Sequence, residues 1–585
     1  MKRDCNPSGP RKGRPFPSRL RPAVVALLAL GGSASAGLAV AQTSDADSAE
    51  KAFTLGGYVR TWASMNLQDQ PETKGDDKHK LSMLRGSILL DADYKPSSTL
   101  RFKAIARVDR EARTSYLKSL EADSPNPKGA KPVGSTAWTF DTAAGGNVGG
   151  LQNFYDNGEF REWWVESDVT DRVKFKFGRQ QIVWGETDFF RSLDVVHGFD
   201  YSWRSFLEVE NEELRKPLVI LRSQIQVPEA KGSLDVFVRP GWDRDGDIGN
   251  TYDLAGGRWA SQPTRGASFL YATSYNYHSK GADQDDVTGG IRWQGIAGPV
   301  NYSVAWINTF NNDPVANPCP ANLALLGTTG AVSFKQAPVA CGFVQTPYTG
   351  GVAGQPQFGD WIFPKTNIFG ATASGYVPAV DAVFTMELGY QRDRSFNYGF
   401  VNQGPVGTNL PGRTNFVAPG ALGVIQKNTL TTMIRMDKQL DLSNLIGTSR
   451  PSFSSIQLFN TRILNFNAAE EIVQLAYWGR ARSKDSALLT GFIVMNYDND
   501  RINPGLAAGW DVSYGGGFII PSIEFVLGDK WRVKAEADLF YASGNEKQSY
   551  LSPTTFLYEE QGKGAGLMGY FSKSNQAMIR VTRQF

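Results

Sequence analysis

Between positions 84 and 108, apolar and polar residues alternate at every second position, and no other feature restricts the fold as strongly. Residues 84–94 and 100–108 carry small or apolar side chains at even positions and mostly charged or polar side chains at odd ones. Successive side chains of a strand point to opposite faces, so the pattern predicts two strands, each with one apolar and one polar face. The intervening Lys95-Pro96-Ser97-Ser98-Thr99 predicts a tight turn.

Pairing Tyr94 with Leu100 across this turn predicts an antiparallel register. That register places three pairs of opposite charge on a polar face toward a lumen: Asp91 with Lys103, Asp93 with Arg101, and Arg85 with Asp109. The alternation recurs at residues 173–178 and 531–541. Polar faces so rich in paired charge favour a transmembrane barrel, whose apolar face meets lipid, over a soluble sandwich.

The C-terminal residues predict a final strand of such a barrel. The chain ends in Phe585, and Ala577, Ile579 and Val581 lie on the same face. A terminal Phe resembles the signal by which the outer-membrane barrel assembly machinery recognises its barrels, although Arg583 stands where an apolar residue is usual. We therefore expect this machinery and outer-membrane lipid as partners.

The first 41 residues predict a cleaved secretory signal peptide. Seven Lys and Arg precede an apolar run over Ala23–Leu30, and Ala39-Val40-Ala41 forms an A-x-A cleavage site, with Ala34-Ser35-Ala36 as the weaker alternative. The segment holds seven of the 61 basic and one of the 58 acidic residues, so residues 42–585 have a formal net charge of −3. No basic excess remains to indicate nucleic acid.

Short and long connections alternate along residues 42–585, as do the periplasmic turns and extracellular loops of outer-membrane barrels. We expect one all-β, transmembrane antiparallel barrel of about 18 strands (roughly 14 to 20), with N- and C-termini in the periplasm. The predicted short turns include Ser483–Asp485, and the long loops include Trp184–Lys216 and Arg392–Lys427. Segment 267–275, which also alternates, is assigned to an extracellular hairpin that folds over or into the pore.

A resemblance to a family lies in the segment that begins near residue 161. Its recognisable residues are Gly178-Arg179-Gln180, then Trp184-Gly185-Glu186 and Leu193-Asp194-Val195-Val196, followed by Arg215 and Pro217. They resemble the uncharacterised outer-membrane family known as domain of unknown function 1302, although His197-Gly198 stand where that family has Asn-Pro. The resemblance implies a transport-associated barrel. It also implies a periplasmic lipoprotein-sorting-like protein and an inner-membrane exporter as partners.

The same segment supplies the candidate constriction of the lumen. Arg179, Gln180, Trp184, Glu186 and Asp194 lie where a predicted strand leaves the wall and an acidic, aromatic loop begins. One interpretation is a lumenal salt bridge of Arg179 with Glu186 that fixes the wall. The other is a constriction of opposite charges that orients a permeant molecule.

Catalysis is not expected. The only three histidines are His79, His197 and His278, and none lies in a convincing spanning strand beside a serine. We therefore assign no catalytic residue and no cofactor. The predicted function is an outer-membrane channel or export-associated barrel for small hydrophobic or amphipathic compounds, and the alternatives are an outer-membrane enzyme or a passive structural barrel.

Two long loops carry further features. Cys319 and Cys341 remain after one cysteine leaves with the signal peptide, and they predict a disulfide in an oxidising compartment. Asp243, Asp245 and Asp247 have the alternate spacing of a calcium loop. Their glycine comes one residue late and the distal Glu is absent, so a solvated loop is favoured and no metal site is assigned.

Overall fold

A computed structural model of the chain describes fourteen segments. They are 52–69, 76–123, 155–187, 190–208, 210–252, 258–259, 285–316, 361–403, 416–474, 481–542, 550–551, 558–559, 567–572 and 574–585. The predicted signal peptide, the cysteine pair, His278 and the segment 267–275 lie outside them.

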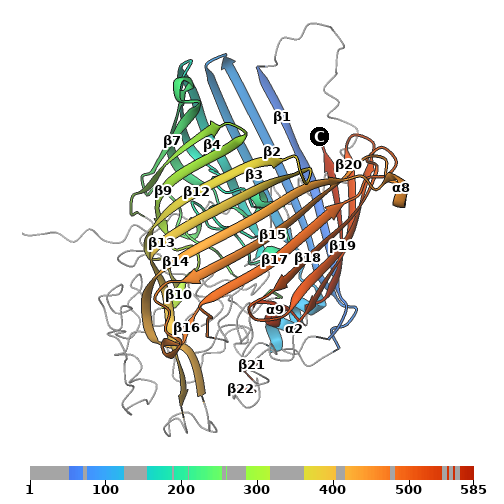
Figure 1. Ribbon diagram of the computed structural model, residues 1–585. Coiled ribbons are helices and arrows are strands. Elements are labelled where there is room, and N and C mark those ends of the chain that lie inside the picture. The colour runs from blue at the N-terminus through green and yellow to red at the C-terminus, as the bar shows by residue number, and fades with distance from the viewer. Residues whose placement is uncertain are drawn as a thin grey trace, which may run out of the picture. The chain divides into compact units, whose positions relative to one another are not determined.

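The alternating segments form a closed antiparallel β-barrel of 18 strands, as predicted (Figure 1). Each strand pairs with the next one around the wall, and the last strand pairs with the first. The wall consists of β1 (Phe53–Asn66), β2 (Leu81–Ser97), β3 (Leu100–Glu111), β4 (Asn157–Thr170), β5 (Val173–Gln180), β6 (Leu218–Val227), β7 (Gly232–Arg239), β8 (Thr288–Ala297), β9 (Val300–Phe310), β12 (Lys365–Val377), β13 (Ala382–Gln403), β14 (Phe416–Leu440), β15 (Ser452–Ile463), β17 (Asp485–Val494), β18 (Ile502–Asp511), β19 (Gly517–Leu527), β20 (Trp531–Tyr541) and β23 (Gln576–Gln584).

Short elements accompany the wall in the connections. The strands are β10 (Val315–Ala316), β11 (Trp361–Ile362), β16 (Ile472–Val473), β21 (Tyr550–Leu551) and β22 (Tyr558–Glu559). The helices are α2 (Ser115–Asp123), α5 (Asn211–Leu214), α8 (Ser443–Ile446), α9 (Leu567–Phe571), and the 3-10 turns η2 (Ser205–Leu207), η3 (Pro228–Ala230), η4 (Asp245–Asp247) and η6 (Ala468–Glu470). No helix in the described part of the chain is long and apolar enough to cross a membrane.

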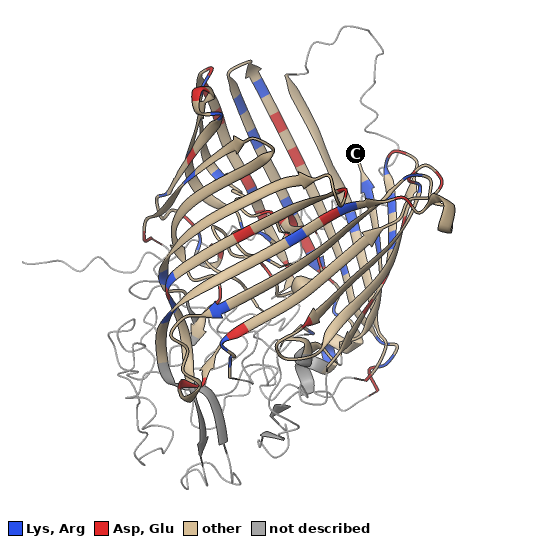
Figure 2. Cartoon of the chain, viewed as in Figure 1, with Lys and Arg blue, Asp and Glu red and all other residues tan. Residues whose placement is uncertain are grey.

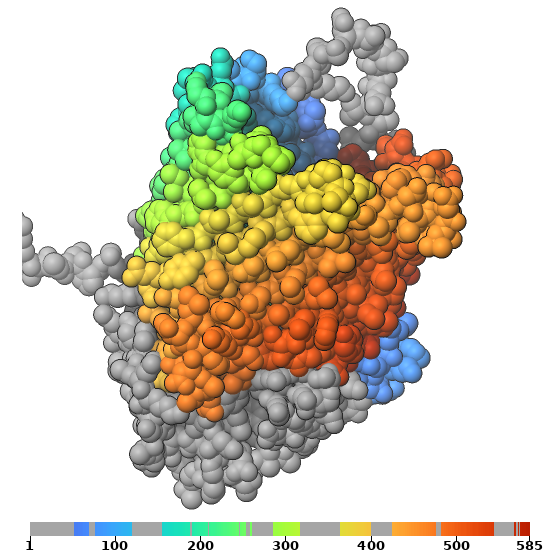
Figure 3. All heavy atoms as spheres, viewed as in Figure 1, coloured from blue at the N-terminus to red at the C-terminus, as the bar shows by residue number. Residues whose placement is uncertain are grey.

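The two faces of the wall have the polarity that the alternation predicts. Leu90, Val304, Ile434 and Ile519 are among many apolar side chains exposed on the outer face of the strands, which is the composition of a lipid-facing belt. In the space-filling view the outer side of β12 to β19 is a continuous surface (Figure 3).

Charge is distributed unequally around the wall. Six of the twelve residues of β3 are charged, whereas β15, β17, β18 and β19 carry one charged residue each (Figure 2). The inner face is therefore strongly ionic near β2 to β5 and largely uncharged near β15 to β19.

The three predicted ion pairs are present, but the predicted register is wrong. Asp93 pairs with Arg101, Lys103 lies 2.6 Å from Asp91, and Arg85 lies 3.2 Å from Asp109. Tyr94 faces Phe102 rather than Leu100, because an irregularity follows Tyr94 before the turn. Each pair is thus diagonal across the strands, a separation that long side chains on one face can bridge.

The connections separate the barrel into two ends. β1 begins and β23 ends at one end, which also carries the short connections after β2, β4, β6, β8, β12, β14, β17 and β19, and we call it the turn end. The other end is the loop end. Figure 1 shows the C-terminus at the turn end.

Two parts of the predicted topology are wrong. Ser483–Asp485, predicted as a short periplasmic turn, lies at the loop end in the connection from β15 to β17. The short connections at residues 495–501 and 512–516 were not predicted. The predicted loop Arg392–Lys427 is largely strand, because β13 and β14 continue past irregularities near Gln391 and Asn397 as a hairpin beyond the wall. The register shifts interrupt the period of two there, so hydrophobic alternation does not reveal this backbone ladder.

Candidate functional site

The connection from β5 to β6, residues 181–217, folds into the barrel, and we call it the inner loop. Its side chains reach opposite sides of the wall: Phe190 contacts Phe459 on β15, and Trp203 contacts Trp62 on β1. The segment Arg179–Asp194 was predicted to shape the lumen because its family-like residues lie where a strand leaves the wall of a wide barrel. The inner loop, which begins within that segment, crosses the lumen.

The base of the inner loop is fixed by a buried histidine. His197 Nε2 accepts a hydrogen bond from the Ile182 backbone N–H at 2.8 Å, so Nδ1 carries the hydrogen and donates to the Lys216 carbonyl oxygen at 2.9 Å. Burial, reinforced by the nearby Arg215 guanidinium, lowers the pKa of His197 to about 3. The ring is therefore a neutral cross-link between the start and the end of the inner loop.

Wall glycines form sockets for two apolar side chains of the inner loop. Gly370 of β12 and Gly389 of β13 face each other, and a Cβ built at either lies 3.0 Å from Leu193. A Cβ at Gly290 of β8 lies 3.1 Å from Trp184. The missing side chains of the wall are thus replaced by those of the inner loop.

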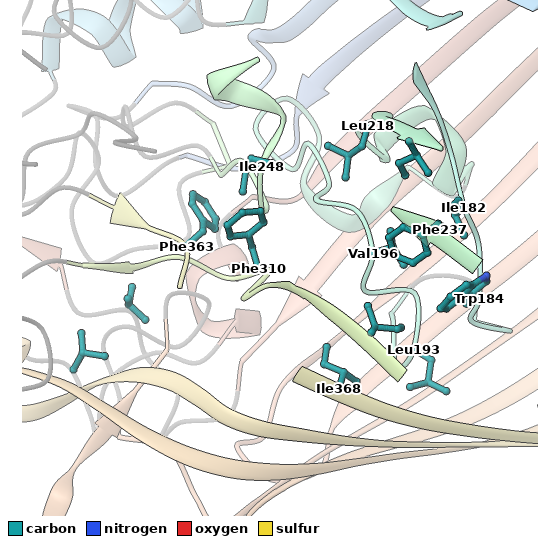
Figure 4. Packing of buried hydrophobic residues seen from close by; sticks show 14 residues of the cluster. Ile182, Trp184, Leu193, Val196, Leu218, Phe237, Ile248, Phe310, Phe363 and Ile368 are labelled. Atoms are coloured by element: carbon teal, nitrogen blue, oxygen red, sulfur yellow. The ribbon is translucent and has the colours of Figure 1, made fainter. Parts of the chain in front are cut away.

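Around these sockets the inner loop and the wall share one apolar cluster (Figure 4). The Trp184 ring lies edge-on to Phe237 with centroids 5.2 Å apart, and its Nε1 donates to Asp235 at 3.0 Å. Both partners belong to β7. Burial of this much apolar surface favours the docked inner loop by several kcal/mol, at roughly 25 cal/mol per Å².

On the opposite side an arginine clamps the inner loop to β20. Arg204 is almost fully buried and pairs with Glu536, while Glu208 lies at 3.3 Å and Asp538 at 3.7 Å. Arg580 of β23 lies 3.2 Å from Glu208 and completes the network. We call these five residues the Arg204 clamp.

A second ionic contact joins the inner loop to β1 and β3. Glu213 accepts hydrogen bonds from Tyr58 at 2.8 Å, from Arg60 at 3.3 Å and from Arg107 at 3.1 Å. Arg60 also reaches Glu210 at 3.0 Å. The acidic residues at the end of the inner loop are therefore paired with arginines of the wall.

Four of the five residues predicted for the constriction are buried. Arg179 pairs with Asp247 and with Glu159, not with Glu186. Gln180 donates to the Ile220 carbonyl oxygen, Trp184 is in the cluster described above, and Asp194 pairs with Arg215. Trp184 docks the inner loop on the wall and Asp194 braces it from within, whereas Arg179 and Gln180 bond residues outside the inner loop. Arg179 is therefore not a cation exposed to the lumen, as one interpretation required.

Glu186, the fifth residue, is exposed, and it contacts the far wall through its backbone. Its N–H donates to the Glu387 carboxylate, which also accepts from the Leu193 N–H at 3.2 Å. Its carbonyl oxygen accepts from Arg435 at 2.7 Å. Both wall residues lie on neighbouring strands, β13 and β14.

The weak calcium candidate has other partners. Asp243 accepts from the Val219 N–H and pairs with Arg239, and Asp247 pairs with Arg179 and Arg244. The side chain of Asp245 is outside the described set. Among the residues that the structure describes, no group of three or more His, Cys, Asp or Glu could hold a metal ion.

Two cavities border the inner loop. The loop-end cavity, about 280 Å³, is lined by Phe190, Arg191, Phe206 and Leu488, among others. The turn-end cavity, about 320 Å³, includes Leu207, Phe492, Ala507, Ile520, Lys534 and Arg580. Leu488 of the first lining and Phe492 of the second both lie on β17, four residues and about 13 Å apart along the strand, with Phe492 nearer the turn end.

Aromatic rings of the inner loop and the wall pack together beside the loop-end cavity. The centroid of Phe206 lies 5.2 Å from that of Phe190 and 5.4 Å from that of Phe518 on β19. Gly509 on β18 makes room for the Phe518 ring, since a Cβ there would lie 2.2 Å from it. We call Phe190, Phe206 and Phe518 the aromatic constriction.

Sequence reasoning did not single out the residues of the clamp or of the constriction. Their signal was present, because residues 186–216 combine several acidic residues with aromatics in a connection too long for a turn. Their partners on the wall could not be predicted from local sequence patterns, since Arg204 and Glu536 are 332 positions apart in the chain.

Comparison with known proteins gives a family. The family model described as "Protein of unknown function (DUF1302)" matches residues 20–552. No curated protein matches the chain in sequence.

Solved structures that match in fold are remote in sequence. Salmonella typhi OmpF in complex with daunomycin is 10% identical and covers 91% of this chain and 97% of its own, with a TM-score of 0.35. The outer membrane channel DcaP of Acinetobacter baumannii is 9% identical and covers 91% and 97%, with a TM-score of 0.34. Pseudomonas aeruginosa OpdK with vanillate is 7% identical and covers 91% and 98%, with a TM-score of 0.39.

Proposed function

The chain belongs to the DUF1302 family of proteins of unknown function, and we propose that it is a bacterial outer-membrane channel whose inner loop narrows the lumen. The observation that carries the proposal is a pair of cavities beside the inner loop, which share β17 in their linings, with the aromatic constriction bordering one of them. We take the two cavities as parts of a permeation path past the inner loop. A barrel of about 18 strands encloses more space than its own side chains fill.

The path favours small amphipathic or hydrophobic molecules. It follows β15 to β19, where the inner face carries Leu488, Phe492, Ala507 and Ile520. Charged side chains also line both cavities, among them Arg191 in one and Lys534 in the other. Such a path selects by shape and by field.

We propose a location in the outer membrane with both termini in the periplasm, and no catalytic role. The contacts of His197 support a structural role for that residue, because both ring nitrogens bond to the backbone. A periplasmic lipoprotein-sorting-like protein and an inner-membrane exporter stay predicted partners, and the direction of transport would follow from them.

Planar-bilayer recordings test the channel. Replacing both Phe190 and Phe206 with Ala should raise the mean conductance several-fold, because truncating the two rings opens the narrowest part of the path. The matched control is Phe175→Ala, since Phe175 lies on β5 with its ring exposed on the outer face. Its conductance should equal that of the wild type.

The result also decides between a channel and a passive structural barrel. Folding of each variant is checked by heat-modifiable migration on a gel. A folded double variant that conducts no more than the wild type contradicts a path through the aromatic constriction. A structural barrel is then the better description.

A further inference from the structure

The loop-end cavity contains a guanidinium group, that of Arg191, for which no carboxylate lies within ion-pair distance among the described residues. Its N–H groups donate to the Tyr201 hydroxyl and, at 2.5 Å, to Asn211 Oδ1. Its Cζ lies 3.5 Å from the ring centroid of Phe199. Its Nε is buried and has no hydrogen-bond partner in the part of the chain that the structure describes. The groups that contact Arg191 directly are thus neutral, although Arg191 carries a charge.

The acidic residues that line the described part of the same cavity are already matched. Asp313 accepts hydrogen bonds from Tyr252 at 2.6 Å and from Asn250 at 3.0 Å, and it lies 3.3 Å from Arg394. Asp194 pairs with Arg215 from the inner loop. The positive charge of Arg191 is therefore not balanced by either carboxylate.

Burial has a measurable consequence for this group. It lowers the pKa of the Arg191 guanidinium, since desolvation disfavours the charged form and the nearest acidic groups only partly oppose it. A buried arginine of this kind is stabilised most by an anion that makes two parallel hydrogen bonds.

Beside Arg191 the cavity is apolar. Phe190 precedes it in the chain, and the centroid of the Phe190 ring lies 6.2 Å from that of Phe459 on β15. Phe206 and Leu488 complete this side. The Arg191 guanidinium and an aromatic and aliphatic surface thus line one cavity of about 280 Å³.

We propose that the loop-end cavity binds an amphipathic monocarboxylate, with its carboxylate on Arg191 and its apolar body against Phe190 and Phe459. The site rests on the proposed function in one respect, since it names the class of molecule that would enter the channel. A carboxylate fits because the Arg191 guanidinium has no ion-pair partner among the described residues, and an apolar tail fits because Phe190, Phe206, Phe459 and Leu488 line the side of the cavity next to it.

Isothermal titration calorimetry on the full chain in lipid nanodiscs tests the site, with empty nanodiscs subtracted. Octanoate is the probe, and octan-1-ol and octylammonium carry the same tail with a neutral and a positive head group. We expect octanoate to bind at least tenfold more tightly than either. Arg191→Gln should weaken octanoate binding at least tenfold and leave octan-1-ol unchanged, whereas Arg191→Lys should retain the preference for the anion.

The matched control is Arg450→Gln, because Arg450 lies near the turn end and pairs with exposed Asp500. It should bind octanoate as the wild type does. Equal affinity for the three probes, or octanoate binding unchanged in folded Arg191→Gln, overturns the site. If octanoate binds as expected to a barrel that does not conduct, the binding site is supported and the proposed channel is contradicted. If the barrel conducts but binds the three probes with equal affinity, the channel is supported and the binding site is contradicted.

Discussion

Arg204→Met should release the inner loop from the wall. The substitution keeps an unbranched side chain but removes the guanidinium from three carboxylates, of Glu208, Glu536 and Asp538, whose side chains are at most 2% exposed. Lys534 lies 2.8 Å from Glu536 and compensates part of the loss. Breaking a buried pair by removing one partner costs about 3–5 kcal/mol.

That cost acts on the equilibrium between the docked and the undocked inner loop. Since 1.4 kcal/mol is a tenfold change, it shifts the equilibrium by roughly 10² to 10³·⁵. If the wild-type inner loop is undocked about 0.01% of the time, the inner loop of Arg204→Met would be undocked roughly 1% to 25% of the time. Single-channel recordings should show this as a high-conductance state that the wild type visits far more rarely.

Two further variants make the measurement decisive. Arg450→Met removes a pair that is about half exposed, worth roughly 0–1 kcal/mol, and should leave the recordings unchanged. Arg204→Met combined with Glu536→Gln removes one of the orphaned carboxylates and should restore part of the closed state. A folded Arg204→Met barrel with the open fraction of the wild type would refute the reasoning.

Three other predictions follow from the same contacts. Gly389→Val should fill a socket of the inner loop, cost about 1–3 kcal/mol of overpacking and raise the open fraction, whereas Gly86→Val, where a Cβ meets nothing within 4 Å, should not. In ¹⁵N spectra at pH 5 the ring of His197 should be neutral with its hydrogen on Nδ1, because its pKa is about 3. Since the unperturbed pKa of histidine is about 6.5, the contribution of His197 to the docking of the inner loop should be complete above about pH 6.5 and should fall as the pH approaches 3. Cys319 and Cys341, outside the described residues, should resist maleimide in unreduced protein, and their disulfide should contribute about 3 kcal/mol.

The sequence was sufficient for the barrel wall because the information there is local. Period two assigns each side chain of β2 and β3 to a face, and charge then selects partners on that face. The ion pairs of Asp91, Asp93 and Arg85 were therefore identified although the register was displaced by two residues. A displacement of two keeps every side chain on its face, whereas a displacement of one would have reversed the wall.

The candidate site was predictable only as a segment. The bounds of the inner loop agree closely with the predicted loop Trp184–Lys216, yet its contacts depend on the closure of the whole barrel. Glu213 meets Arg60 and Arg107 only after β1 and β3 have been brought around the wall. Gly389 cannot be told from any other strand glycine until Leu193 is seen beside it.

The unequal charge of the wall indicates which side of the inner loop yields to a permeant molecule. Toward β1, β3 and β20 the inner loop is held by buried ion pairs, which have one geometry and cost several kcal/mol to break. Toward β15 to β19 the contacts of Phe190 and Phe206 are aromatic and aliphatic, and these are non-directional. An apolar molecule that displaces the two rings replaces their contacts with its own, whereas a hydrated ion offers no such replacement. The aromatic constriction should therefore open to amphipathic molecules while the Arg204 clamp stays closed, and the resting conductance to inorganic ions should be low.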